Sequence, residues 1–307
     1  MSGFCAWLKA GVAAALFAAV LWFADPASVA ASLDAADAHW LMAGLLLSVL
    51  SNIVSAQRWR QLVLGFGGRM GGVFATLVYF RAMALNALLP GAVVGGDLFR
   101  SLVARREGMD ARSAGLTVLL DRVGGLWVLI AISVASAGYA LHEAGVDAGD
   151  MDLPLRLSGL LAAAGLLVMP ARVLPAVVAR CPAAWRERIG RVPRMPSLYR
   201  RQVLSSVLVQ LLSIAALAAA GRAIGLPLPA AVWIFVAAPV FVMAALPVSV
   251  GGWGSREAAA VATLALFGVA PAQATAVSVL YGLFGLVQAA TGGLLFMQRS
   301  GAGRQPG

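Results

Sequence analysis

Long apolar runs separated by short polar segments dominate the pattern along this chain. A helix needs about 20 mainly apolar residues to cross a lipid bilayer. Six runs come close to or exceed that length, at residues 4–24, 40–56, 114–141, 155–178, 203–221 and 272–297. Two further apolar stretches, residues 72–100 and 229–268, are interrupted by proline and glycine. The pattern predicts an all-α integral membrane protein, a single polytopic domain over residues 1–307, with about eight transmembrane helices and two re-entrant or broken segments.

Composition supports this class. Hydrophobic residues make up 61% of the chain and charged residues 12%, whereas soluble domains carry about 25% charged residues. Such a chain has too little polar surface for a soluble enzyme, a nucleic-acid-binding domain or a disordered scaffold. We therefore expect no nucleic-acid partner, although the formal net charge is +10.

The positions of the charges predict the topology. All but one of the 23 basic residues are arginine, and they cluster at the ends of the apolar runs. Segments 25–39 and 142–152 carry acidic but no basic side chains, whereas segment 172–201 holds eight arginines and one glutamate. Because basic loops stay in the cytoplasm, we predict an Arg-rich cytoplasmic loop at 172–201, with both termini cytoplasmic. The first run also resembles a cleavable signal peptide; we prefer an uncleaved first helix.

The first interrupted stretch, residues 72–100, has arginines on both flanks. It must therefore enter and leave the membrane by the same face, as a re-entrant hairpin or a tight helical pair. Irregular backbone cannot face lipid, so such a break has to line an enclosed or watery cavity.

The two interrupted stretches share a pattern. Each has Leu-Pro, a short spacer, Gly-Gly, and an arginine four residues after the second glycine. The residues expected to form the backbone breaks are Pro90, Gly95, Gly96, Pro247, Gly251 and Gly252. Proline ends helices and glycine adopts conformations closed to other residues. Paired breaks in the two halves of a membrane chain indicate a transporter site and a possible inverted repeat; chance similarity between apolar, Gly-rich segments is the alternative.

Ionisable residues lie in or beside these apolar stretches, where they are costly and usually face a cavity or a partner. They are Arg81, Asp97, Arg100, Asp121, Arg122, Arg256 and Glu257. Asp121 and Arg122 are adjacent on a helix and cannot pair fully with each other. Asp121 would pair with Arg100 or Arg256, and Arg122 with Asp97 or Glu257. The alternative is a set of structural ion pairs that lock the helices together.

The charge balance of this group favours an anionic ligand. Its arginines outnumber its acids by one, and the arginine fork matches phosphate oxygens. Helix N-termini after the glycine pairs would add backbone N–H groups for the same anion. A residual positive charge in a semi-buried site suits a single phosphodiester.

At these residues the chain resembles a known family. The matching segments, in order, are Ser55 to Trp59, Asn86 to Pro90, Gly95 to Arg100, Leu120 to Gly125, and Pro247 to Glu257. Together they resemble the flippase-like transmembrane region of lysylphosphatidylglycerol synthases, over residues 58–296. The resemblance implies a bacterial or archaeal plasma-membrane protein that moves polar-headed lipids between leaflets, and it adds Asn86 to the candidate site. Aminoacyl-transferring members carry a soluble catalytic domain after this region, whereas this sequence ends at Gly307, so lysyl transfer is not expected.

The function predicted from the sequence is a flippase-like transport of a phosphate-bearing lipid through a polar cavity in the bacterial inner membrane. We expect neither enzymatic activity nor a cofactor, and no metal site; His39 and His142 are interpreted as interfacial residues. Two alternatives stay open. One is a membrane enzyme acting on a lipid-phosphate headgroup, marked by a metal site of Asp97, Asp121 and Glu257. The other is a non-catalytic partner that recruits a glycosyltransferase or a lipid-modifying enzyme.

Overall fold

The computed structural model describes residues 18, 25–88, 93–145, 152–180, 186, 195–246 and 251–301, and every regular element among them is helical. The elements in chain order are α2 (Pro26–Asp34), α3 (Ala38–Gly65), α4 (Gly72–Leu88), α5 (Val93–Arg106), α6 (Ala111–Glu143), α7 (Asp152–Arg180), α9 (Met195–Ala223), α10 (Ala230–Ala245), α11 (Ser255–Leu264), the short 3₁₀ helix η2 (Ala265–Phe267) and α12 (Pro271–Gly301). The all-α prediction is confirmed.

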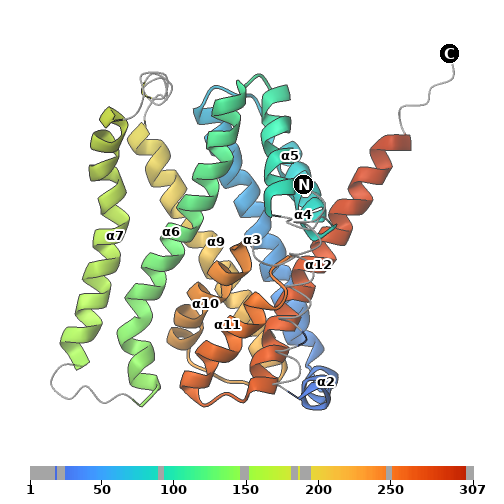
Figure 1. The fold of residues 1–307 in the computed structure, drawn as a ribbon, viewed down its shortest axis with the longest axis vertical. Coiled ribbons are helices and arrows are strands. Elements are labelled where there is room, and N and C mark those ends of the chain that lie inside the picture. Colours follow the sequence, from blue (N-terminus) through green and yellow to red (C-terminus); the bar gives the residue numbers. More distant parts are fainter. Residues whose placement is uncertain are drawn as a thin grey trace.

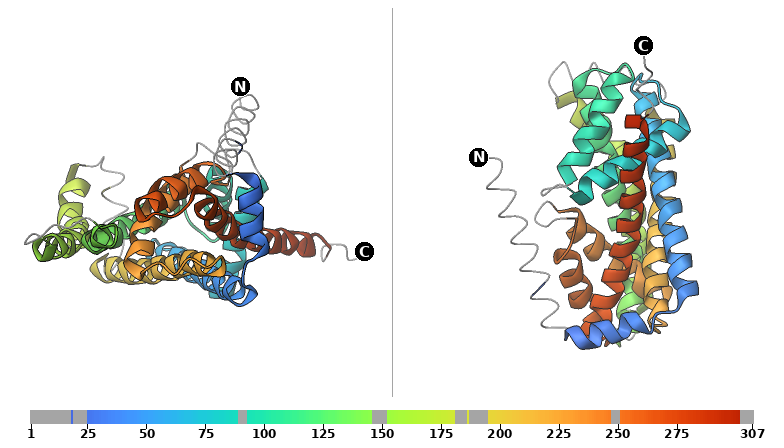
Figure 2. Two further views of the ribbon diagram at one scale, coloured as in Figure 1. Left: turned by 90° about the horizontal axis from the view of Figure 1, so that it is seen from below. Right: turned by 90° about the vertical axis from the view of Figure 1, so that its right-hand side faces the viewer.

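Five of the predicted spans appear as long apolar helices. Among the described residues, α3, α6, α7, α9 and α12 each contain a segment long and apolar enough to cross a membrane. They run between the two ends of the bundle (Figure 1), and α2 lies across one of those ends (Figure 2). The chain is therefore a multi-pass membrane protein. The predicted first span, residues 4–24, lies outside the described residues apart from Ala18.

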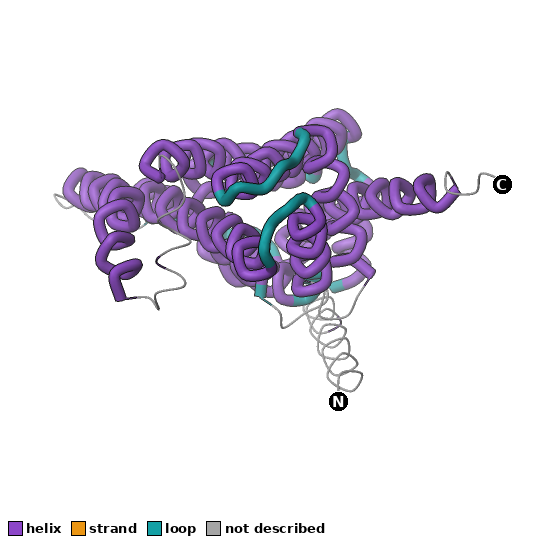
Figure 3. The backbone as a smooth tube through the Cα atoms, turned by 90° about the horizontal axis from the view of Figure 1, so that it is seen from above, coloured by secondary structure: helices purple, strands orange, loops and turns teal. Residues whose placement is uncertain are grey.

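The two ends of the bundle differ in charge. One end, at the top of Figure 1, carries the connections α3 to α4 and α5 to α6, with Arg69, Arg105, Arg106 and Arg112. These two connections are joined by a hydrogen bond from the Arg69 N–H to the Glu107 carbonyl, 3.2 Å long. Figure 3 views this end from above. We call it the Arg-rich end, and the opposite end, with Asp25, Asp34 and Asp37, the acidic end.

The Arg-rich segment 172–201 is partly helical. Its first residues continue α7 as far as Arg180, and its last residues begin α9 at Met195. Residues 181–194 between these two helices lie outside the described residues, Arg186 excepted.

Each interrupted stretch is a pair of short helices. The pair α4–α5 lies towards the Arg-rich end and the pair α10–α11 towards the acidic end (Figure 2). The first pair thus enters and leaves by one face, as predicted, and the second pair comes from the opposite face. This opposition is the arrangement that an inverted repeat produces. Pro90 and Pro247 lie between the helices of each pair and outside the described residues.

The glycines of the two pairs do different work, which corrects the sequence expectation. Gly251 and Gly252 have φ of 61° and 81° and shape the turn before α11, as a backbone break requires. Gly95 and Gly96 instead lie inside α5, so they are not the break itself. At Gly96 a Cβ would collide with the Ala82 carbonyl oxygen and with the Asn86 side chain. Gly96 therefore permits close packing of α4 against α5.

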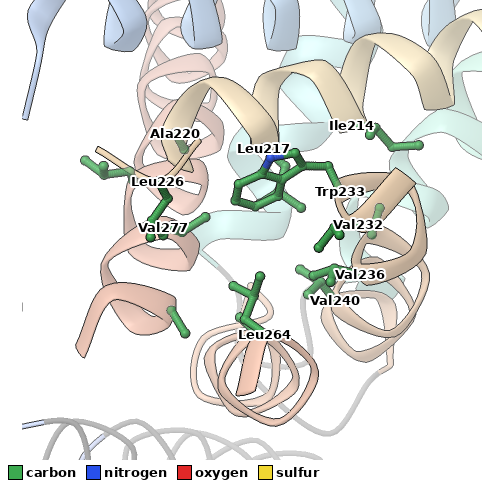
Figure 4. Packing of buried hydrophobic residues seen from close by; sticks show 14 of the residues in the cluster. Ile214, Leu217, Ala220, Leu226, Val232, Trp233, Val236, Val240, Leu264 and Val277 are labelled. Carbon is green, nitrogen blue, oxygen red and sulfur yellow. The ribbon is translucent and has the colours of Figure 1, made fainter. Parts of the chain in front are cut away.

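The larger apolar core lies where α9, α10, α11 and α12 meet (Figure 4). Trp233 of α10 is almost wholly buried there, beside Leu217 of α9 and Leu264 of α11. A Cβ at Gly221 would collide with the Trp233 ring, so a small residue on α9 makes room for the large one. Such close backbone approach is how membrane helices gain packing contact without a hydrophobic driving force.

Polar side chains also tie α3 to its neighbours within the bundle. The Ser51 and Ser213 hydroxyls lie 2.7 Å apart between α3 and α9. The Asn52 side chain donates to the Gln288 side-chain oxygen Oε1 at 2.9 Å, and the Gln288 side-chain amide donates to the Ser48 hydroxyl at 2.8 Å. These bonds fix α3, α9 and α12 as the scaffold against which the first helical pair and α6 are held.

Candidate functional site

Five charged side chains from α3, α5 and α6 form one connected group, which we call the arginine–aspartate chain. Its members, in order of contact, are Arg58, Asp121, Arg100, Asp97 and Arg122. Helix geometry explains how the sequence builds it. Asp97 and Arg100 are one turn apart and share a face of α5, whereas the adjacent Asp121 and Arg122 point in different directions from α6.

Asp121 is the buried centre of this chain. Arg58 Nε donates to one carboxylate oxygen at 2.8 Å, and Arg100 Nη2 donates to the other at 2.6 Å. Arg58 also reaches the Asp121 backbone carbonyl and the Ser206 hydroxyl, both at 3.1 Å. All three charged side chains are nearly inaccessible. One carboxylate thus holds α3, α5 and α6 together.

Arg100 is enclosed by aromatic rings. Its guanidinium carbon lies 4.6 Å from the centroid of the Trp59 ring and 4.8 Å from that of Tyr79. Cation–π contacts of this kind stabilise a desolvated guanidinium. The Trp59 indole donates in turn to the Thr117 hydroxyl at 3.3 Å, which fixes its plane. The buried Arg100 Nε has no hydrogen-bond partner in the described structure, so the arginine–aspartate chain contains one N–H donor without an acceptor.

Asp97 and Arg122 form the accessible end. Arg122 donates to both carboxylate oxygens through Nε, at 3.3 and 3.0 Å, and through Nη2 at 3.0 Å. The Arg122 side chain is 36% exposed and that of Asp97 22%. Asp97 also lies 3.6 Å from Arg100 Nη1. It therefore stands between a buried arginine and an exposed one.

Arg122 sits well below the end of its helix. It lies eleven residues beyond Ala111, which corresponds to ~17 Å along an α-helix. The whole helix has 33 residues and is ~50 Å long, so a hydrocarbon core about 30 Å thick that is centred on it would surround Arg122. A part-exposed guanidinium at this depth is typical of a substrate or ion pathway.

The charges of the arginine–aspartate chain do not cancel, because three guanidinium groups face two carboxylates. The buried Arg58, Asp121 and Arg100 carry one positive charge in excess. Asp97 lies between Arg100 and Arg122 and can compensate that charge when an anion meets Arg122. The excess positive charge can therefore be balanced by an anion that reaches Arg122. The guanidinium of Arg122 can donate two parallel hydrogen bonds, which suits a phosphate.

The second charged group is closed. Arg256 Nη2 and Nε donate to Glu257 Oε1 at 2.7 and 3.1 Å, and the Ser278 hydroxyl donates to the same oxygen at 3.0 Å. Glu257 Oε2 accepts the Gly254 N–H at 2.6 Å. Glu257 is completely buried and Arg256 nearly so. This group, the Arg256–Glu257 pair, fastens the start of α11 to α12.

That arrangement bears on the expected anion site at the second break. The Glu257 carboxylate accepts the N–H of Gly254, the residue immediately before α11, so a side chain of the protein itself caps the start of this helix. Arg256 also lies 4.8 Å from the centroid of the Trp253 ring. Geometry therefore assigns both side chains a structural part in the described state.

Two other predicted site residues serve helix packing. Arg81 of α4 donates to the Leu295 carbonyl of α12 at 2.8 Å, at a point where α4 and α12 lie in close contact. Asn86 accepts the Gly96 N–H at 2.8 Å and so joins the two helices of the first pair. Neither belongs to the arginine–aspartate chain.

The pairing hypotheses can now be resolved. Asp121 pairs with Arg100, not with Arg256, and Arg122 pairs with Asp97, not with Glu257. Arg58 lies in the matching segment Ser55 to Trp59 but is not among the predicted site residues. Its signal was positional, since Arg58 lies seven residues inside the end of α3, whereas Arg60 and Arg69 lie closer to that end.

The three carboxylates that could have marked a metal-dependent enzyme do not come together. Asp97 and Asp121 are each held by arginines, and Glu257 belongs to the other group. In the part of the chain that the structure describes, no three His, Cys, Asp or Glu side chains are placed to hold a metal ion.

Comparison with known proteins gives one family. The family described as the lysylphosphatidylglycerol synthase TM region matches residues 7–292. A search of curated proteins gives no match. The family match covers most of the chain, including both helical pairs and every charged residue discussed above. The chain therefore belongs to the family of the lysylphosphatidylglycerol synthase transmembrane region.

Proposed function

We propose that this protein moves a phosphate-bearing lipid between the leaflets of the membrane, and that Arg122 receives the lipid phosphate. The observation that carries the proposal is the part-exposed Arg122–Asp97 pair at the end of a buried, net positive row of charges. Membership of the family supports a membrane protein of this kind. The lipid is a phospholipid or a polyprenyl-linked lipid, and the two reporters of the assay below distinguish these classes.

Asp97 supplies a way to release Arg122 for the phosphate. In the described state it neutralises Arg122, and Arg100 Nη1 already lies 3.6 Å away. A phosphate that takes over Arg122 lets Asp97 turn wholly towards Arg100, whose Nε has no partner. The carboxylate thus stays compensated while the guanidinium changes partner, which keeps the cost of binding low.

The arginine–aspartate chain links the helices that such an exchange would move. Asp97 and Arg100 belong to the first helical pair, and Arg122 belongs to the long helix α6. Loss of the Arg122–Asp97 bond would loosen α5 from α6 at the exposed end only, because Asp121 still holds Arg100 and Arg58. The lipid headgroup would pass at this junction while its acyl chains stay in the bilayer.

The proposed setting follows from the positive-inside rule. The Arg-rich end would face the cytoplasm of a bacterial cell, with the C-terminal end of α12 on the same side. A glycosyltransferase or lipid-modifying enzyme that supplies or consumes the lipid is the class of partner this setting suggests. No contact in the described residues favours a second function over lipid movement.

The test is a leaflet-accessibility assay in proteoliposomes. Fluorescent phospholipid and polyprenyl-phosphate reporters are used with wild type and with Arg122→Ala. We expect at least a tenfold slower movement of the substrate reporter in the variant, because the phosphate loses its bidentate partner. The control is Arg112→Ala, which removes an exposed arginine at the start of the same helix and should leave the rate unchanged. An unchanged rate in folded Arg122→Ala protein contradicts the proposal.

A further inference from the structure

A groove opens at the Arg-rich end between α3 and α9, away from the charged groups described above. Its volume is about 740 Å³, and its lining includes Arg60, Leu64, Ser197 and Arg201. Cavities of this size accept small ligands or a headgroup. At its floor the helices are in close contact, since a Cβ at Gly65 would lie 2.7 Å from Leu198 Cδ2.

The charged side chains that line this groove are positive. Two of its lining residues are arginines, and the described residues that line it include no acid. Arg60 Nε donates to the Met70 carbonyl at 2.7 Å, which holds that guanidinium in place. Arg201 is exposed on the first turns of α9. Such a basic pocket between membrane helices suits an anionic headgroup.

Below the groove, the same face of α9 becomes apolar. Ser197, Arg201, Leu204, Leu208 and Leu211 follow the spacing of three and four residues that places side chains on one helical face. The three leucines are 63%, 48% and 47% exposed. On α3, Leu64 beside Arg60 is also exposed. The face thus reads from the end of the bundle inward as a polar head region followed by an apolar strip.

We propose that this groove binds one phospholipid with an anionic headgroup, resident in the leaflet at the Arg-rich end. Arg60 and Arg201 hold the phosphate, and an acyl chain lies along the leucines of α9. The order of polar then apolar residues matches the order of chemistry in a lipid, which a soluble phosphate would not require. Arg122 does not line this site, and the proposal does not depend on transport of lipid between the leaflets.

The experiment is native mass spectrometry of the full-length protein, purified in detergent and incubated with phosphatidylglycerol or with phosphatidylcholine of the same chains. We expect one tightly retained phosphatidylglycerol on wild type and about fivefold weaker retention on Arg201→Gln, because one arginine contact is lost. Arg200→Gln is the matched control, since it removes an adjacent exposed charge that does not line the groove. It should retain the lipid as wild type does.

Three outcomes would overturn the proposal. Equal loss in the Arg200→Gln and Arg201→Gln variants would assign retention to general surface charge. Equal retention of phosphatidylcholine would remove the requirement for an anionic headgroup. Displacement of the bound lipid by soluble glycerol phosphate at equal concentration would show that the apolar strip contributes nothing. The readout is lipid retention, so its failure leaves the Arg122 transport assay unaffected.

Discussion

The two helical pairs carry similar charges and treat them in opposite ways. In the first pair, Asp97 of α5 reaches Arg122 of α6 at a part-exposed contact, and three arginines share two carboxylates. In the second pair, Arg256 and Glu257 neutralise each other, and Ser278 and the Gly254 N–H complete the hydrogen bonds of the carboxylate. One group ends in an accessible cation and the other is closed on all sides.

This difference assigns ligand binding to the group beside the first helical pair and a structural role to the group in the second. A buried, fully bonded ion pair holds a fold in one arrangement, and breaking it is costly. A part-exposed pair with excess positive charge can exchange its partner for an anion at lower cost. The first copy of the Gly-Gly pattern contributes Asp97 to the contact with Arg122 of α6, which we assign to the ligand. The second copy contributes the Arg256–Glu257 pair, which we assign to the scaffold.

The largest expected effect is loss of the buried centre of the first group. Asp121→Asn places an amide N–H₂ opposite Arg58 or Arg100 and leaves two buried cations with no counter-charge from this position. We expect a fall of about 3–5 kcal/mol in the apparent free energy of unfolding. Titration with sodium dodecyl sulfate, followed by circular dichroism, measures it. A loss below that of Glu257→Gln would contradict the central place given to Asp121.

The next effect tests the closed group. Glu257→Gln keeps one carbonyl oxygen but removes the charge that meets Arg256, so we expect a loss of about 2–3 kcal/mol. The same titration measures stability, and the lipid assay is normalised to folded protein. We expect a normal transport rate per folded molecule. A tenfold lower rate in folded Glu257→Gln protein would instead place the second group in the transport path.

A smaller effect distinguishes the packing of the first pair. Gly96→Ala puts a methyl group against the Ala82 carbonyl and the Asn86 side chain, and overpacking of this kind costs about 1–3 kcal/mol. Gly115→Ala in α6 is the control, because a Cβ there meets nothing within 4 Å. Alanine should be neutral or stabilising at that position, by up to about 1 kcal/mol. Equal losses in the two variants would refute the close approach of α4 and α5.

The smallest expected effect concerns a helix cap that lies outside both charged groups. Asp37 caps the start of α3, and the His39 N–H donates to its carboxylate at 2.7 Å. This hydrogen bond lowers the pKa of Asp37 below 3.8. The contribution of this hydrogen bond to stability is therefore fully present at pH values above the ordinary pKa of an aspartate, and it is lost as the pH falls through the lowered pKa of Asp37. Asp37→Asn should flatten this acid dependence slightly in thermal scans between pH 2 and 5; an unchanged acid dependence would contradict the capping role.

Much of the architecture was predictable because the spans are continuous apolar runs with most of their charges at the ends. Positive residues on both sides of residues 72–100 fixed the return of α4 and α5 to one face. The pairing of Asp121 with Arg100 and of Arg122 with Asp97 was among the alternatives, since neighbours on a helix point apart and must find partners elsewhere.

Other features could not be read from the sequence. Arg58 lies close to Arg60 along the chain, and only the register of α3 against α6 turns it inward to Asp121. Gly95 and Gly96 repeat the Gly-Gly sequence of Gly251 and Gly252, yet α5 begins before the first two and α11 begins after the last two. Gly96 therefore serves helix packing, whereas Gly251 and Gly252 form a turn. Asn86 looked like a ligand residue, but its proximity to Gly96 makes it a helix tie.

The central claim is that the open group, and not the closed one, meets the lipid. Its most direct test compares leaflet exchange of a phosphate-bearing reporter in proteoliposomes of wild type, Arg122→Ala and Glu257→Gln, each corrected for folded protein. We predict a rate at least tenfold lower for Arg122→Ala and a wild-type rate for Glu257→Gln. A wild-type rate for Arg122→Ala, or equal losses in the two variants, would contradict the account.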